Sequence, residues 1–181
     1  MARKVYFGMD ECFGSDLNDP IIIALCVSCD ESDARKGETL RKRRDLDRGL
    51  FRHDFLYTLV RERSKGSQVD LISDMVGRLI FEGTRRFMHR GDVLNLLFDS
   101  EFWGIEHFYI GTPEVFDSVR FIRRGDSCVP LLYRADHLAS CLYTFHSSSQ
   151  VSKRRIGQFR SVYPGFGERI ASARVELSSK G

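Results

Sequence analysis

The sequence predicts a single α/β domain built on a mixed central β-sheet that is flanked by α-helices. Its 181 residues match the length of one typical domain and suffice to bury a core. Apolar runs of strand length, at 21–27 and 93–98, alternate with segments of helical apolar spacing, at 68–88 and 131–145. A hydrophobic fraction of 42% with only 4 Pro and 15 Gly excludes collagen-like and wholly disordered classes.

The first half of the chain predicts three strands. In residues 5–11 apolar side chains alternate with others, which predicts a β-strand, and the segment ends in two acids. After a turn at 14–20, the run IIIALCV at 21–27 is apolar throughout, which is typical of a strand covered on both faces. Its short link to the first strand predicts an antiparallel hairpin. Residues 30–48 are charged and weakly helical, and 51–60 end in a third strand.

The second half predicts two helices and two more strands. One apolar stripe runs through 68–88, so this helix should pack on the sheet. A strand at 93–99 again ends in an acid, and 118–123 form a further strand. The last long helix begins at Pro130. On its helical wheel Asp136 lies at the border of the buried stripe, whereas His137 lies near the solvent side.

Charge is distributed unevenly along the chain. The total is +3, from 28 basic and 25 acidic residues, but residues 35–65 alone carry about +6. We interpret about 30–50 as a basic insertion, with a nucleic-acid-binding surface as the hypothesis and a solvated helical face as the alternative. Aromatic residues close behind the insertion favour the hypothesis modestly. The candidate nucleic-acid-binding residues are Arg41, Lys42, Arg43, Arg44 and Arg48.

The cellular compartment is predicted from two kinds of segment that the sequence does not show. The longest apolar run, 21–27, is far short of the roughly 20 residues that a membrane span needs, and no signal-type segment follows the first residues. We therefore expect a cytoplasmic location and no membrane contact. Five cysteines is an odd number for a disulfide framework, so reduced thiols are expected.

Three acids carry the functional hypothesis. Asp10 and Asp99 each follow a hydrophobic strand at its carboxyl end, where open α/β sheets place their ligands, and Asp136 borders the buried face of the last helix. Converging carboxylates suit Mg²⁺ or Mn²⁺, and such a site performs phosphoryl chemistry. The alternative is that each acid caps a strand or pairs with an arginine.

Three segments resemble the ribonuclease H-like superfamily: FGMDE (7–11), LNLLFD (94–99) and YRADHLASCLYTF (133–145). The opening Asp-Glu pair is similar to that of ribonuclease HII. The Ala-Asp helix looks more like an uncharacterised prokaryotic group with Asp-Glu-Ser-Gly near its start and Leu-Gln-x-Ala-Asp near its end. The resemblance covers residues 4–146 and implies a ribonuclease H-like mixed sheet flanked by helices. It also implies that the metal-binding and catalytic acids are Asp10, Glu11, Asp99 and Asp136.

The departures from these families concern selectivity. Ribonuclease HII has Gly-Arg-Gly shortly after its acids, a feature that reads the junction sugar, whereas this chain has Cys12, Phe13 and Gly14. Its selectivity for RNA within a DNA duplex is therefore not expected here. Tyr133 replaces the glutamine of the prokaryotic group. Neighbouring strand residues point to opposite faces, so Asp10 and Glu11 share a metal only if the strand kinks or ends there.

Other motifs are weaker. Cys26 and Cys29 form a C-x-x-C, read as a redox pair, half a zinc site or two small residues at the end of a buried strand, and we favour the last. Trp103 could stack on a base, but a core position is the favoured interpretation. Glu101 is a spare acid near the site that we do not expect to be a ligand.

The sequence therefore predicts a ribonuclease H-like domain over 1–150 and a basic C-terminal extension over 151–181, either a small helix pair packed on the same domain or a loosely attached tail. The predicted function is a divalent-metal-dependent nuclease acting on nucleic acid. The alternative is a non-catalytic nucleic-acid-binding or assembly module with the same fold, and a third, weaker one is a thiol redox protein.

Overall fold

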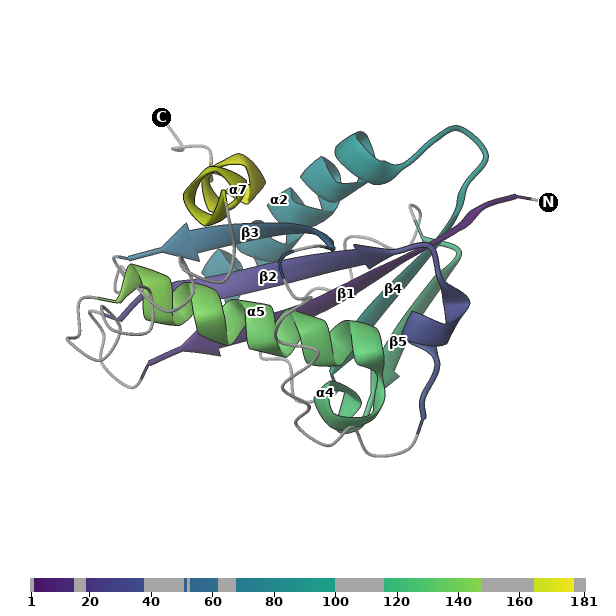
Figure 1. The fold of residues 1–181 in the computed structure, drawn as a ribbon, viewed down its shortest axis with the longest axis horizontal. Helices are drawn as coiled ribbons and strands as arrows, with labels where there is room; N and C mark the ends of the chain where they lie inside the picture. The colour runs from purple at the N-terminus through teal and green to yellow at the C-terminus, as the bar shows by residue number, and fades with distance from the viewer. Residues whose placement is uncertain are drawn as a thin grey trace.

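A mixed five-stranded sheet forms the centre of the molecule (Figure 1). The computed structural model describes residues 2–14, 19–37, 51, 53–61, 68–99, 116–147 and 165–177. The sheet has the order β3-β2-β1-β4-β5. Its strands are β1 (Lys4–Phe13), β2 (Ile21–Ser28), β3 (Asp54–Val60), β4 (Val93–Asp99) and β5 (Ser118–Ile122).

The pairing combines two antiparallel and two parallel contacts. β2 is antiparallel to both β1 and β3, whereas β4 is parallel to both β1 and β5. The predicted α/β class, the mixed sheet and the first hairpin are confirmed. β1 is the middle strand, and parallel β1 and β4 end at the same edge of the sheet.

Two long helices cover the two faces of the sheet. α5 (Pro130–His146) lies on one face and α2 (Gln68–Phe87) on the other (Figure 1). Three short helices complete the described part: the 3₁₀ helix η1 (Glu31–Ala34), α4 (Gly125–Cys128) and α7 (Phe166–Ala173). Of the charged segment predicted to be weakly helical, η1 and the residues around it lie within the described residues, and 38–50 lie outside them.

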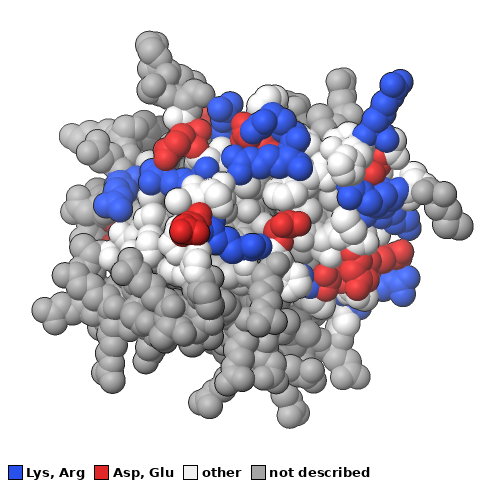
Figure 2. All heavy atoms as spheres, turned by 45° about the horizontal axis from the view of Figure 1, so that its top comes forward, with Lys and Arg blue, Asp and Glu red and all other residues white. Residues whose placement is uncertain are grey.

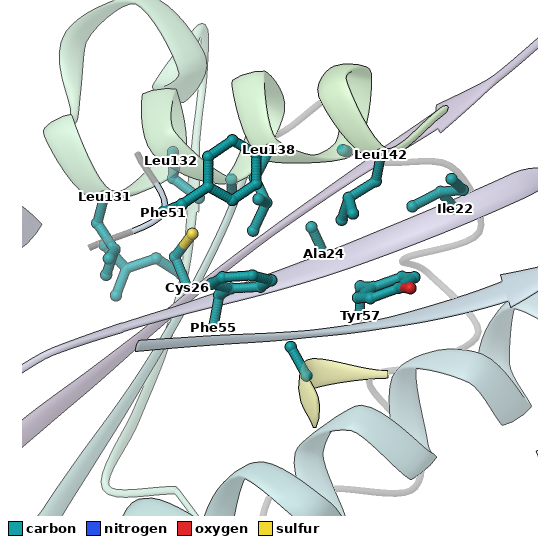
Figure 3. Close-up of a cluster of buried hydrophobic side chains, with 14 of the residues drawn as sticks. Ile22, Ala24, Cys26, Phe51, Phe55, Tyr57, Leu131, Leu132, Leu138 and Leu142 are labelled. Atoms are coloured by element: carbon teal, nitrogen blue, oxygen red, sulfur yellow. The ribbon is translucent and has the colours of Figure 1, made fainter. Parts of the chain in front are cut away.

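The core has one layer on each face of the sheet, because strand side chains alternate between faces. Toward α5 the buried cluster joins alternate residues of β2 and β3 to the apolar stripe of α5 (Figure 3). Toward α2 a second cluster contains Phe7, Met9 and Leu25 with the stripe of α2. β2 serves both layers, and its residues 21–27 are all buried, as the uninterrupted apolar run predicts.

A glycine sets the close approach of α5 to the middle strand. A Cβ at Gly8 would lie 2.7 Å from Cγ of Leu131, in the first turn of α5, so a larger residue would force the helix away from β1. This contact holds α5 against the strand that carries Asp10, two residues further along β1.

The described C-terminal segment packs against β3 and α5. The Phe166 ring at the start of α7 lies 5.0 Å from that of Phe51 and 5.6 Å from that of Phe145, in edge-to-face contacts. Beyond α7, the backbone N–H of Val175 donates to the carbonyl of Tyr57 in β3 at 2.8 Å. α7 thus extends the core on the α5 face, whereas Val175 joins the cluster on the α2 face.

A buried ion pair ties η1 to α5. The guanidinium of Arg134, whose side chain is 5% exposed, pairs with the carboxylate of Asp33 and lies 3.2 Å from Nδ1 of His53. A buried charge requires such a partner, since leaving it alone costs several kcal/mol (about 3–5). These contacts fix η1 and the start of β3 relative to α5.

Among the described residues, no helix has both the length and the hydropathy needed to cross a membrane. On the face drawn in Figure 2, Lys and Arg are interspersed with Asp and Glu, so the described residues there form no patch of a single sign. The predicted basic residues Arg41, Lys42, Arg43, Arg44 and Arg48 lie outside the described residues.

Candidate active site

Asp10 and Asp99 come together at the carboxyl ends of two parallel strands. The last residues paired between β1 and β4 are Met9 and Phe98, so each aspartate is the next residue of its strand. Strand alternation places both on the face covered by α5, since Gly8 contacts α5 and Leu97 belongs to the core cluster on that face. Both carboxylates are buried, with 9% and 5% of the residue exposed.

Asp136 reaches the same place from α5. Burial raises the pKa of Asp10 to about 9, and the charges of Glu11, Asp136 and Asp99 contribute to this shift. Three separate elements, β1, β4 and α5, therefore bring carboxylates close enough to disfavour the ionisation of Asp10. Asp136 itself is half-buried, which agrees with its position at the border of the helix stripe.

Glu11 lies beside these acids, but its side chain leaves β1 on the opposite face of the sheet. β1 continues beyond the acids, pairing with β2 as far as Phe13, so alternation assigns Glu11 to the α2 face. Its backbone N–H donates to Oδ1 of Asp10 at 2.8 Å, and its Oε2 is shielded from solvent. The structure thus brings Asp10, Asp99 and Asp136 to one face, with Glu11 adjacent at the sheet edge.

Sequence reasoning missed a fifth acid, Asp126 of α4. Its backbone N–H donates to Oδ2 of Asp99 at 3.0 Å. Burial raises the pKa of Asp126, and the charges of Asp99 and Asp136 add to the shift. Its sequence signal is weak, because Asp126 lies in the short Arg-Gly-Asp-Ser segment between a strand and the helix that begins at Pro130, and this segment has no periodicity.

The turn that carries Asp126 is built to approach Asp99. Arg124 has a left-handed backbone, with φ of 54°, and begins α4. A Cβ at the buried Gly125 would lie 2.3 Å from Cδ1 of Leu132 and 3.3 Å from Oδ2 of Asp99. Glycine therefore allows the backbone of α4 to reach the carboxylate.

Cys12 is the sulfur nearest the acids, on the same face as Asp10. Burial raises the pKa of its thiol to about 11, and the charges of Asp136 and Asp10 contribute, although a hydrogen bond with Ser140 acts in the opposite direction. The thiol is therefore protonated at neutral pH and is a poor metal ligand. The donors left at the site are carboxylate oxygens.

This donor set fits a hard divalent cation such as Mg²⁺ or Mn²⁺, which prefers oxygen ligands and would relieve the repulsion recorded in the pKa of Asp10. In the described part of the chain, no three His, Cys, Asp or Glu side chains are grouped so that they could hold a metal ion. Binding a cation would therefore require the carboxylates to draw together.

The remaining candidates lie elsewhere. Cys26 is buried in β2, Cys29 is exposed, and both are free thiols. His137 is half-buried, with its ring 4.2 Å from that of Tyr133. Glu101 and Trp103 lie outside the described residues.

Comparison with known proteins identifies the fold. Bst-RNase HIII, solved in complex with Mn²⁺, matches 95% of this chain and 71% of its own, with a TM-score of 0.53 and 12% identity. The chain has a ribonuclease H-like fold. The predicted resemblance is confirmed at that level. No family model matches the chain, and neither does any curated protein sequence.

Two further solved structures share this ribonuclease H-like fold. The ribonuclease H2 from Pyrococcus horikoshii OT3 has a TM-score of 0.50 at 16% identity and matches 96% of this chain and 82% of its own. The RNase HII from Archaeoglobus fulgidus, solved in a complex with PCNA, has a TM-score of 0.50 at 12% identity and matches 97% and 96% of the two chains.

Proposed function

We propose that this chain is a divalent-metal-dependent nuclease that hydrolyses phosphodiester bonds of nucleic acid. The supporting observation is the environment of Asp10, a buried carboxyl whose pKa is raised to about 9 by burial and by acids from three other positions. A site that concentrates negative charge in this way attracts cations, and carboxylate oxygens select Mg²⁺ or Mn²⁺. The Mn²⁺ complex of Bst-RNase HIII, which has the same fold, agrees with this choice.

In this proposal Asp10, Asp99 and Asp136 hold the metal and Glu11 assists. Bound there, Mg²⁺ or Mn²⁺ supplies an activated water and stabilises the leaving oxygen of a displacement at phosphorus. Asp10 gives up its proton when the site is loaded, because a ligating carboxylate must be ionised. The backbone N–H of Asp126 holds one oxygen of Asp99, which fixes the orientation of that carboxylate.

Substrate contact is assigned to the basic insertion. Arg41, Lys42, Arg43, Arg44 and Arg48 would track the phosphate backbone, a mode of binding that weakens as salt increases. We retain the division into a domain over 1–150 and an extension over 151–181, and the cytoplasmic location, as predictions.

The test is cleavage of end-labelled substrates by the full chain. We expect cleavage of at least one of an RNA–DNA hybrid, single-stranded RNA, single-stranded DNA or duplex DNA with Mn²⁺ or Mg²⁺, and none with EDTA. Asp10→Asn and Asp99→Asn should each reduce the rate by at least about 100-fold. Asp70→Asn, an exposed acid on α2, is the matched control and should keep full activity. Activity retained by both site variants would disprove the proposed chemistry.

A second candidate is a non-catalytic nucleic-acid-binding or assembly module. It is favoured by the absence, in the described residues, of three side chains grouped to hold a metal, and by the Cys12–Gly14 departure from the ribonuclease HII pattern. This module would bind nucleic acid with a steep salt dependence that Mg²⁺, EDTA and Asp10→Asn leave unchanged. Turnover with any metal excludes it.

A further inference from the structure

A polar cavity lies at the opposite end of the parallel strands from the acids. Its volume is about 250 Å³. Its floor is a row across three strands, because Tyr6 of β1 is paired in register with Asn95 of β4, and Asn95 with Ser118 of β5. The full lining is Lys4, Tyr6, Glu31, Ala34, Arg35, Asn95, Ser118 and Arg120.

This row is open because α5 does not extend over it. The first turn of α5 contacts β1 at Gly8, which is two residues after Tyr6 on the same face of the strand. The single turn of η1 and the residue after it, Arg35, provide one wall. The cavity is smaller than the roughly 300–1,000 Å³ of sites for drug-sized molecules, so it suits a compact polar group.

The floor holds an amide donor without an acceptor. Ser118 donates its hydroxyl to Oδ1 of Asn95 at 2.6 Å, which orients the amide. Nδ2 of Asn95 is shielded from solvent and has no hydrogen-bond partner among the described residues. Leaving such a donor unmatched costs free energy, and a rotation of the Asn95 side chain that turns Nδ2 into the cavity would let a ligand oxygen satisfy it.

The charge of the lining is positive. Three cations and one carboxylate give a net charge of +2. Glu31 is shared by two of the cations, with its oxygens 3.4 Å from Nζ of Lys4 and 2.9 Å from the guanidinium of Arg35. Arg120 donates to the carbonyl of Ala34 at 3.2 Å and pairs with no carboxylate in the part of the chain that the structure describes. Its guanidinium therefore has donors left for a ligand.

We propose that this cavity binds a phosphate group, with Arg120 and Lys4 neutralising its charge and the amide of Asn95 donating to one of its oxygens. A phosphate is compact, carries oxygen acceptors on all sides and matches the planar donors of arginine. It reaches the cavity either as free phosphate or as the 5′-terminal phosphate of a nucleic acid strand. This site is separate from the acids and does not depend on the proposed nuclease activity.

The test is calorimetry with inorganic phosphate on the full chain in EDTA, together with the ¹⁵N signal of the Asn95 side-chain amide. We expect saturable binding with a shift of that signal. Arg120→Gln and Asn95→Asp should each weaken binding by about tenfold or more, since charge-assisted hydrogen bonds are lost. Arg90→Gln, which removes an exposed positive charge outside the cavity, is the matched control and should change binding by less than about twofold.

A second arm identifies the source of the phosphate. If the ligand is a strand end, a short DNA oligonucleotide with a 5′-phosphate binds more tightly than the same strand without it, and Arg120→Gln removes the difference. If it is free phosphate, the 5′-phosphate adds nothing while inorganic phosphate still binds. The absence of inorganic phosphate binding, or equal binding by Arg120→Gln and Arg90→Gln, overturns the proposal. Asp10→Asn should bind phosphate normally, so the two proposals fail independently.

Discussion

Oδ2 of Asp99 accepts a hydrogen bond from the backbone N–H of Asp126 at 3.0 Å. The contact joins the end of β4 to α4, 27 residues further along the chain. Because the donor is a main-chain group, it is present whatever the side chain at position 126. The orientation of Asp99 is therefore set by the path of α4.

Asp126→Asn should keep at least about one tenth of any metal-dependent cleavage, because the backbone N–H survives and the asparagine amide can still donate to Asp99 in place of the carboxyl that now hydrogen-bonds it. Asp99→Asn, measured alongside under the same metal, should lose it. An Asp126→Asn variant as inactive as Asp99→Asn would show that the side chain of Asp126 is itself required.

Gly125→Ala should lower the stability of the protein by about 1–3 kcal/mol, since the added methyl group must displace the buried Leu132. It should also reduce cleavage, because Asp99 is pushed from the α4 backbone. Urea unfolding measures the first effect. The control is Gly77→Ala in α2, where an added Cβ meets nothing within 4 Å and should stabilise the helix by up to about 1 kcal/mol. Equal effects at the two positions would contradict the packing argument.

Asp10→Asn should raise stability in EDTA by about 1 kcal/mol or more, seen as an increase in Tm of at least about 2–4 °C. The native pKa of Asp10 lies above its unfolded value, so the native aspartate loses stability as pH rises from about 4 through 9, which the neutral amide avoids. The difference between variant and parent should therefore grow with pH across this range. A variant less stable than its parent at pH 8 would mean that the acids do not repel one another.

Asp33→Asn should destabilise the fold by about 3 kcal/mol, because it leaves the buried guanidinium of Arg134 without its counter-charge. The double variant Asp33→Asn with Arg134→Met removes the stranded charge and should recover most of the loss. Denaturant unfolding of the two single variants and the double variant provides the measurement. Additive losses in the double variant would rule out the coupling.

Acidification should destabilise the protein partly through His146. Burial lowers its pKa to about 4, with the charges of Arg174 and Arg61 contributing, and its Nε2 lies 3.1 Å from the hydroxyl of Tyr57. Since the native pKa lies below the unfolded value of about 6.5, the stability is present above pH 6.5 and is lost as the pH falls toward 4.

Allowing for the partial exposure of the ring, we expect His146 to contribute about 1 kcal/mol of the stability difference between pH 7 and pH 5. In urea unfolding, the difference in unfolding free energy between pH 7 and pH 5 should be about 1 kcal/mol smaller for His146→Gln than for the parent. An unchanged difference would assign the acid sensitivity to other groups.

Most of the fold could be predicted because the apolar residues of each strand and each long helix follow one clear spacing. β2 is apolar at every position because both layers of the core use it, and α5 begins at Pro130, where the missing N–H costs nothing. The order of acids on strand, strand and helix then placed Asp10, Asp99 and Asp136 at one edge.

The position of Asp126 at the site and the polar cavity proposed to bind phosphate could not be predicted in the same way. α4 is a single turn with no periodicity, and its approach to Asp99 depends on the small size of Gly125 and the left-handed backbone of Arg124. The cavity unites residues from four elements through strand register, and Lys4, Asn95 and Arg120 have no spacing in common. Both features arise from tertiary contacts that leave no pattern along the chain.

The sheet holds Asp10 and Asp99 from opposite sides. At its own position Asp10 pairs with Ala24 of β2, in the interior of the sheet, whereas Asp99 pairs with Ile122 of the edge strand β5. Asp99 also accepts a hydrogen bond from α4, a four-residue helix that packs mainly against α5. Fraying of the edge strand β5 would therefore loosen the backbone of Asp99 while that of Asp10 stays paired with β2.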